Sequence, residues 1–148
     1  MLLSQTAEYA LRATVWLADT PETPHTTQEI AEVTKVPAGY LSKVMQALGR
    51  AGLVKSQRGL GGGFLLTRSP DELTVLDIIN AVDPVQRIHT CPLNLKSHGK
   101  KLCPLHRKLD DAMADMEEAF ASTQLSELLN PDNKIKPLCE VTVGGKKA

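Results

Sequence analysis

The residues best suited to bind a metal lie close together in the second half of the chain. Between positions 89 and 106 there are two cysteines and three histidines, namely Cys91, Cys103, His89, His98 and His106. Thiolate sulfur suits iron–sulfur clusters and zinc, and imidazole is a common partner ligand. Cys103 directly precedes Pro104, which favours the start of a helix, and a helix N-terminus lowers the pKa of a thiol. This stretch therefore predicts a metal or cluster site, or a redox-active thiol.

A second group of chemically active residues is basic. The whole chain is neutral, with 17 basic and 17 acidic residues, so its net charge indicates no partner. Residues 33–70, however, contain no Asp or Glu, and their cations are Lys35, Lys43, Arg50, Lys55, Arg58 and Arg68. An acid-free basic tract is typical of a surface that contacts phosphates, although a solvated basic face has the same composition.

The basic tract includes a glycine-rich turn between two short apolar runs, residues 52–54 and 64–66. Glycine adopts positive φ without strain, so this pattern predicts a β-hairpin with a flexible tip. Gly63 is followed by Phe64, whereas a phosphate-binding P-loop requires Lys and then Ser or Thr, and the dinucleotide motif requires a third glycine and a helix. The turn is therefore interpreted as a hairpin.

Helical signals precede the hairpin. A helix is expected over about residues 4–19, and Thr26 with Glu29 predicts a reciprocal N-terminal cap for the next one. Pro37 ends that helix and can open another over about residues 37–50, which carries apolar residues at helical spacing. Helix, turn, helix and hairpin in this order predict a winged helix-turn-helix fold, mostly α with a small β-hairpin wing, whose second helix fits a major groove.

Further helices follow the wing. Thr74 is expected to cap a helix that ends at Asp83-Pro84, and a loop of about twenty residues follows, a length that usually marks function. A long helix over about residues 104–122 has an apolar stripe with little of its own domain left to cover it, which favours a homodimer. We expect a DNA-binding domain at 1–83, a sensor or cofactor loop at 84–103, a dimerisation region at 104–130 and a flexible tail at 131–148.

Five segments resemble the winged-helix regulators of the IscR/NsrR type, the Rrf-two superfamily. The matching segments are residues 3–12, 40–43, 48–54, 58–66 and 73–83, and together they span about residues 1–109. The resemblance implies a dimeric bacterial transcription factor, most often a repressor. It also implies that iron–sulfur, nitric oxide or redox status is sensed through a cluster bound in the loop after the wing domain.

The resemblance also implies which residues bind a cluster. Cluster-binding relatives have three loop cysteines with five residues between neighbours; Cys91 and Cys103 match the outer two, but Ser97 occupies the middle position. Some relatives add an acidic residue from the first helix of the partner chain, matched by Glu8, and others a histidine three positions after the last cysteine, matched by His106. The implied site for a 2Fe-2S cluster is therefore Cys91, Cys103, Glu8 and His106, with His98 as an alternative to His106.

Simpler interpretations remain open at this point. Glu8 and Arg12 have the i, i+4 spacing of a surface ion pair. Cys91 and Cys103 could bind zinc, form a reversible disulfide, or hold no cofactor. Cys139 is expected to be a free thiol in the tail.

For DNA, the expected contacts divide between the second helix and the wing. We expect Ser42, Lys43 and Gln46 near base edges; Tyr40, Arg50, Lys55 and Arg68 on the phosphate backbone; and Arg58 in the minor groove at a tip formed by Gly59 and Gly61. The predicted target is a palindromic duplex. An aromatic content of 3% argues against stacking on single strands, and RNA is not expected.

Other classes of protein are disfavoured. There is no nucleophile elbow, paired catalytic carboxylates or metallohydrolase motif, so an enzyme is not expected. An odd cysteine count without an export or membrane-spanning segment favours the cytoplasm. Two rival functions remain: an apo or zinc-bound regulator controlled by a protein partner, a small molecule or thiol oxidation, and a metal-binding interaction module without DNA binding.

Overall fold

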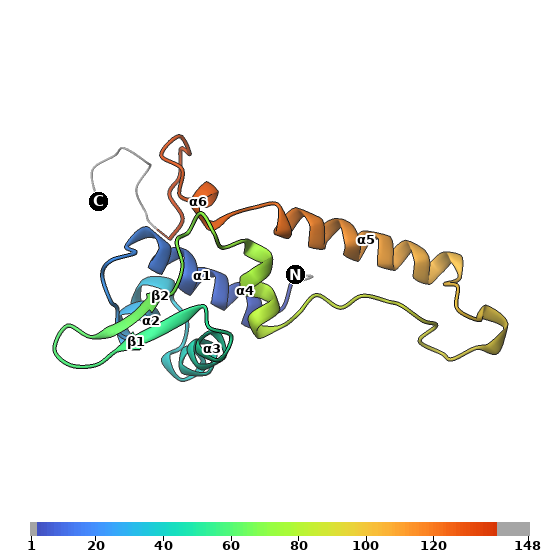
Figure 1. Ribbon diagram of the computed structural model, residues 1–148, viewed down its shortest axis with the longest axis horizontal. Coiled ribbons are helices and arrows are strands. Elements are labelled where there is room, and N and C mark those ends of the chain that lie inside the picture. The colour runs from blue at the N-terminus through green and yellow to red at the C-terminus, as the bar shows by residue number, and fades with distance from the viewer. Residues whose placement is uncertain (1–2, 139–148) are drawn as a thin grey trace.

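The computed structural model describes residues 3–138, and Figure 1 shows one long helix that extends away from the body formed by the other elements. The elements, in chain order, are α1 (Gln5–Asp19), α2 (Thr27–Thr34), α3 (Ala38–Arg50), β1 (Val54–Gln57), β2 (Gly63–Leu66), α4 (Val75–Val82), the 3-10 turn η1 (Lys96–His98), α5 (Pro104–Ala121) and α6 (Leu125–Leu128). This order confirms the predicted winged helix-turn-helix fold, which is mostly α.

Helix α1 runs through the centre of the body, and α2, α3, α4 and β2 all pack against it. It begins where Ser4 Oγ accepts a hydrogen bond from the Ala7 amide at 3.1 Å. Small side chains on its buried face, Ala7, Ala10 and Ala13, are fully covered and allow the neighbouring helices to approach closely. Leu11, which helical spacing alone places on the buried stripe, is only partly buried.

Helices α2 and α3 form the helix-turn-helix. Thr26 Oγ1 accepts from the Glu29 amide, but the expected reciprocal cap is only half formed, because the Glu29 carboxylate lies 3.0 Å from His25 Nδ1 instead. Lys35 ends α2 in the left-handed region, with φ at 60°. The face of α3 predicted to be apolar is buried, namely Leu41, Val44, Met45 and Leu48.

The wing is an antiparallel hairpin in which Val54 pairs with Leu66 and Gln57 with Gly63. The first strand therefore extends further into polar residues than the apolar run at 52–54 indicates. His25, far earlier in the chain, adds a one-residue third strand: its amide donates to the Phe64 carbonyl at 3.1 Å and its carbonyl accepts from the Phe64 amide at 2.7 Å. This bridge ties β2, close to the tip of the wing, to the segment between α1 and α2.

Helix α4 carries a complete capping box between Thr74 and Asp77. The chain after α5 returns to this helix, because the Leu125 amide donates to the Leu73 carbonyl and the Val75 amide donates to the Thr123 carbonyl, both at 2.9 Å. Leu125 is fully buried and belongs to the main core. Helix α6 thus packs as part of the body.

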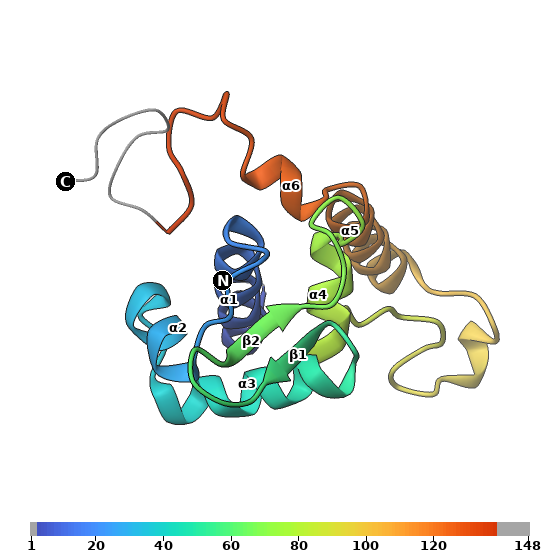
Figure 2. The same cartoon turned by 60° about the vertical axis from the view of Figure 1, so that its left-hand side comes forward.

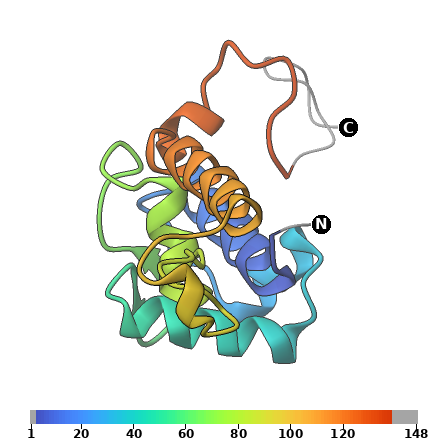
Figure 3. The same cartoon turned by 90° about the vertical axis from the view of Figure 1, so that its right-hand side faces the viewer.

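The C-terminal part of α5 packs on α4. The N-terminal part of α5 extends away from the body towards the loop that contains η1. The wing and this loop therefore lie at opposite ends of the molecule (Figure 1). Viewed from the loop end, α5 crosses in front of the body (Figure 3). On the predicted apolar stripe, Leu105 and Leu109 remain 62% and 44% exposed.

The first part of the predicted tail contacts α1. Lys136 Nζ lies 2.7 Å from Asp19 Oδ2, and Leu138 packs against the core. Cys139 and the remainder of the predicted flexible tail lie outside the described residues. Among residues 3–138, no helix has the length and apolar character needed to cross a membrane.

Candidate nucleic-acid interface and sensor loop

The polar face of α3 is open to solvent along its length. Because its apolar residues face the core, the intervening positions point outward, and Figure 2 shows α3 along the edge of the body next to the hairpin. The exposed residues include each base-contacting residue predicted on this helix and one predicted phosphate contact: Ser42, Lys43, Gln46 and Arg50. Ser42 Oγ donates to the Ala38 carbonyl at 3.2 Å, which leaves its lone pairs free to accept.

Tyr40 differs from the other predicted DNA contacts because its hydroxyl already has a partner. It forms a short hydrogen bond with the Thr6 hydroxyl, and the Tyr40 ring meets the Tyr9 ring edge-on at 5.4 Å between centroids. Arg12 lies over the other aromatic ring, 5.2 Å from the Tyr9 centroid. Tyr40 therefore fixes the N-terminal turn of α3 against α1, and a phosphate contact remains a prediction for it.

The wing presents its predicted residues to solvent as well. Lys55, Arg58, Gly59, Gly61 and Arg68 are all exposed. Within residues 3–138, the cations of α3 and the wing take part in none of the ion pairs, which involve Arg12, His25, Arg87 and Lys136. The positive charge of this surface is therefore not neutralised by an ion pair with any acidic residue among residues 3–138.

In the loop predicted to be the sensor, the structure brings together two of the predicted metal ligands. Cys103 is the N-cap of α5, and its Sγ lies 3.3 Å from His106 Nδ1 on the first turn of that helix. Cys91 is only 5% exposed. The Nδ1 atom of His98 is buried without a hydrogen-bond partner among the described residues, as expected of a nitrogen that is available to bind a metal.

Glu8 lies on α1 in the body, whereas the loop lies at the far end of α5 (Figure 1). Its carboxylate Oε1 accepts from Arg12 Nε at 3.0 Å, so the predicted surface ion pair is present. The second oxygen, Oε2, is close to the same nitrogen but off the N–H direction, and makes no hydrogen bond within residues 3–138. Among residues 3–138, no three or more His, Cys, Asp or Glu side chains are gathered as a metal site, and Glu8 is not brought to the loop cysteines of its own chain.

An ion cluster that sequence analysis missed connects the loop to α5. Arg87 donates to both Asp110 oxygens, at 2.7 and 2.9 Å, and to Glu117 at 3.3 Å, while the Ile88 amide donates to Asp110 at 2.9 Å. The Arg87 hydrogen bond, and then the Ile88 amide, lower the pKa of Asp110 below its usual range. Asp110 and Glu117 are seven residues apart and so share a helix face, which is the only signal in the sequence.

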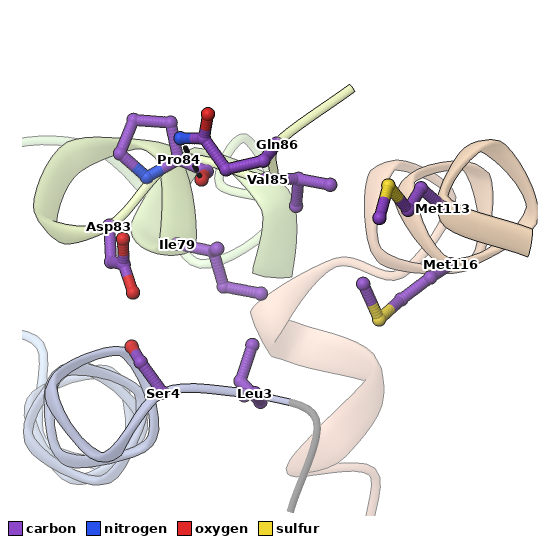
Figure 4. Close-up of a pocket in the computed structure, with 9 residues that line it drawn as sticks. All are labelled: Leu3, Ser4, Ile79, Asp83, Pro84, Val85, Gln86, Met113 and Met116. Atoms are coloured by element: carbon purple, nitrogen blue, oxygen red, sulfur yellow. Dashed lines mark hydrogen bonds between the residues drawn. The ribbon is translucent and has the colours of Figure 1, made fainter. Parts of the chain in front are cut away.

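A cavity of about 290 Å³ separates α5 from the start of α1. Figure 4 shows Met113 and Met116 of α5 on one side of it, and Leu3 and Ile79 on the other. Its remaining wall comes from Ser4 and from the segment after α4, namely Asp83, Pro84, Val85 and Gln86. Helix α5 thus leaves open space beside its apolar stripe.

Comparison with known proteins gives consistent matches over most of the chain. The Rrf2 family, described as "Iron-dependent Transcriptional regulator", matches residues 3–131. A protein of Aquifex aeolicus, whose name assigns it to HTH-type transcriptional regulators, is 32% identical over 137 residues, which cover 90% of this chain and 95% of that protein.

Two solved structures are similar throughout. CymR (YrzC), the global cysteine regulator of B. subtilis, is 29% identical with a TM-score of 0.71, and the match covers 85% of this chain and 94% of that one. T. potens IscR is 27% identical with a TM-score of 0.72, covering 86% of this chain and 85% of that one.

Proposed function

Because the chain belongs to the Rrf2 family of transcriptional regulators, we propose that it represses transcription as a dimer on a palindromic operator, under the control of its loop. Its matched relatives are regulators rather than enzymes, which agrees with the prediction that it is not an enzyme. The observation that carries the proposal is the exposed set of cations on α3 and the wing, none of them neutralised by an ion pair within residues 3–138.

DNA recognition divides between two elements. Lys43 and Gln46 on α3 have the donors and acceptors needed to read base edges in a major groove. Arg58 at the wing reaches the adjacent minor groove, where the narrow walls strengthen the attraction for a guanidinium group. Lys55 and Arg68 at the base of the wing bind phosphates and hold the domain in register.

Dimerisation follows from the incomplete packing of α5. Leu105 and Leu109 are exposed on the helix that projects from the body, and the cavity beside Met113 and Met116 leaves room for side chains of another chain. A second copy covers this stripe, and its two-fold symmetry places two α3 helices on the two halves of a palindrome.

The loop acts as the sensor. Cys91, Cys103 and His106, with Glu8 of the second copy, are the residues that would hold a 2Fe-2S cluster, and the buried free nitrogen of His98 makes it the alternative nitrogen ligand. The family description as iron-dependent supports iron. A bound cluster supplies a redox-sensitive group whose oxygen and nitrogen ligands raise its potential. Zinc, or thiol oxidation without a metal, is the rival state of the same site.

The ion cluster provides a route from the loop to the dimer. Arg87 and the Ile88 amide hold the start of the loop on Asp110, in the N-terminal half of α5. A change at Cys103, the N-cap of that helix, therefore acts on the element that sets the spacing of the two DNA-reading heads.

Arg58→Ala tests DNA binding. We expect the affinity for a specific duplex to fall about tenfold. The negative slope of log affinity against log salt concentration should become shallower by about one, because one cation close to the phosphates is lost. Arg107→Ala removes an equal charge at the opposite end of the molecule and serves as the control. Equal affinities of wild type and Arg58→Ala, measured by fluorescence anisotropy, would contradict the assignment of the wing.

Anaerobic purification tests the sensor. We expect a coloured protein that contains iron, with a visible absorption that Cys91→Ala and Cys103→Ala abolish, while Ser97→Ala retains it. A colourless protein that contains zinc, or one that stays colourless after iron–sulfur reconstitution, would exclude the cluster and favour the rival states.

A further inference from the structure

Leu60 stands alone at the apex of the wing. It carries the only side chain among residues 59–63, because the other four positions are glycine, and its relative exposure is 109%. A single exposed leucine is common on protein surfaces. What distinguishes Leu60 is its place, between Gly59 and Gly61 and two residues from Arg58, at the end of the hairpin.

The backbone fixes where this leucine lies. The Gly62 amide donates to the Gly59 carbonyl at 3.0 Å, which closes a four-residue turn with Leu60 at its second position. Gly61, the third residue, has φ at 73°, as a type II turn requires. A Cβ at Gly62 would lie only 2.4 Å from the Gln57 carbonyl oxygen, so this tight tip depends on glycine. Leu60 is therefore presented by a constrained turn rather than by packing.

The flanking residues suit the minor groove. Glycines make the tip thin, the nearby Arg58 is exposed and carries the charge that a narrow groove attracts, and residues 33–70 contain no acid that would repel phosphates. Proteins that bind the minor groove frequently place leucine or another apolar side chain between base steps.

Resting on the proposed DNA-binding function, we propose that Leu60 is an apolar wedge that enters the minor groove beside Arg58. It packs on the deoxyribose walls and on a partly opened base step, and it thereby favours sites with a flexible pyrimidine–purine step at that position. Leu60 thus contributes sequence selectivity without a hydrogen bond to any base, whereas Arg58 contributes charge.

Leu60→Ser tests the wedge on a fluorescein-labelled duplex recovered by the wild-type protein from a randomised library. Because the variant loses the apolar contact, we expect binding to weaken about tenfold. The salt slope should stay unchanged, because no phosphate contact is lost, in contrast to Arg58→Ala. Leu60→Met should bind nearly as well as wild type. Ile135→Ser, which changes an aliphatic side chain that is 73% exposed in the segment after α6, is the matched control and should not alter affinity.

A second duplex separates a wedge from a general effect on the wing. Replacing the flexible pyrimidine–purine step under the wing by a single purine–purine step, without a whole A-tract that would narrow the groove around Arg58, should weaken wild-type binding and leave Leu60→Ser almost unaffected. If Leu60→Ser binds the selected duplex within about twofold of wild type, below the loss expected for a buried leucine, the wedge is refuted while the DNA-binding function stands. If wild-type protein binds no duplex even at low salt, the proposed function fails, and the wedge with it.

Discussion

Gly63→Ala probes the contact that anchors the wing to the body. A Cβ at this position would lie 2.3 Å from the carbonyl carbon of His25 and 2.4 Å from its oxygen, both backbone atoms that no rotamer change can move. The φ of Gly63 is 149°, a value that residues with a side chain rarely adopt. The hairpin must therefore shift away from His25.

The cost follows from what that shift breaks. Two hydrogen bonds join His25 and Phe64, at 2.7 and 3.1 Å, and each contributes about 0.5–1.5 kcal/mol net. The strained backbone of the new alanine adds about 1–3 kcal/mol where the shift is incomplete. We expect the free energy of unfolding to fall by about 2–6 kcal/mol in total.

Urea unfolding followed by far-UV circular dichroism measures this change. Gly49→Ala in α3 is the matched control, because a Cβ at Gly49 meets no atom within 4 Å apart from the helix's own backbone, and alanine is favoured in helices. That control should be stabilised by up to about 1 kcal/mol. If Gly63→Ala unfolds with the free energy of wild type, the close approach of the wing to His25 is not a determinant of stability.

Two further changes test other contacts. Arg87 holds the pKa of Asp110 in the folded protein below its usual range. The ionised Asp110 therefore stabilises the folded state fully above about pH 4, the pKa of an aspartate in the unfolded chain. This stabilisation is lost as the pH falls through the lower pKa of the folded state. Asp110→Asn should flatten the acid side of the unfolding free energy measured between about pH 6 and 2, and an unchanged profile would show that the pair contributes nothing. Leu125→Ala empties a fully buried site and should cost about 2–5 kcal/mol in urea unfolding, more than Leu128→Ala at a partly buried one, and equal losses would contradict the docking of α6.

Contacts between residues close in sequence were readable from the chain. Thr74 caps the helix that it was expected to cap, and the apolar face of α3 is the one that helical spacing indicates. The glycine-rich turn was correctly predicted as a hairpin, and residues 54–57 pair with residues 63–66 on either side of it. These features depend on hydrogen bonds and periodicities that span few residues, so sequence order carries them.

Where two partners compete for one side chain, local reasoning was less successful. Glu29 was expected to complete a reciprocal cap with Thr26, but its carboxylate forms a hydrogen bond with the His25 ring instead. His25 is in turn placed by its bridge to Phe64, which lies far along the chain. The choice between the two partners therefore belongs to the folded wing rather than to the helix start.

By itself, the sequence determined the order of helices α1 to α5 and of the hairpin, the acid-free surface of α3 and the wing, and the two loop cysteines with a serine between them, whereas η1 and α6 were not predicted. Only the tertiary structure decided that Arg87 joins Asp110, 23 residues away, that Leu125 returns to the core, and that Glu8 lies in the body rather than beside the loop of its own chain. The physical reason is that such contacts arise when packed helices bring distant residues together, and neither spacing nor residue type encodes which of many charged or apolar candidates will meet.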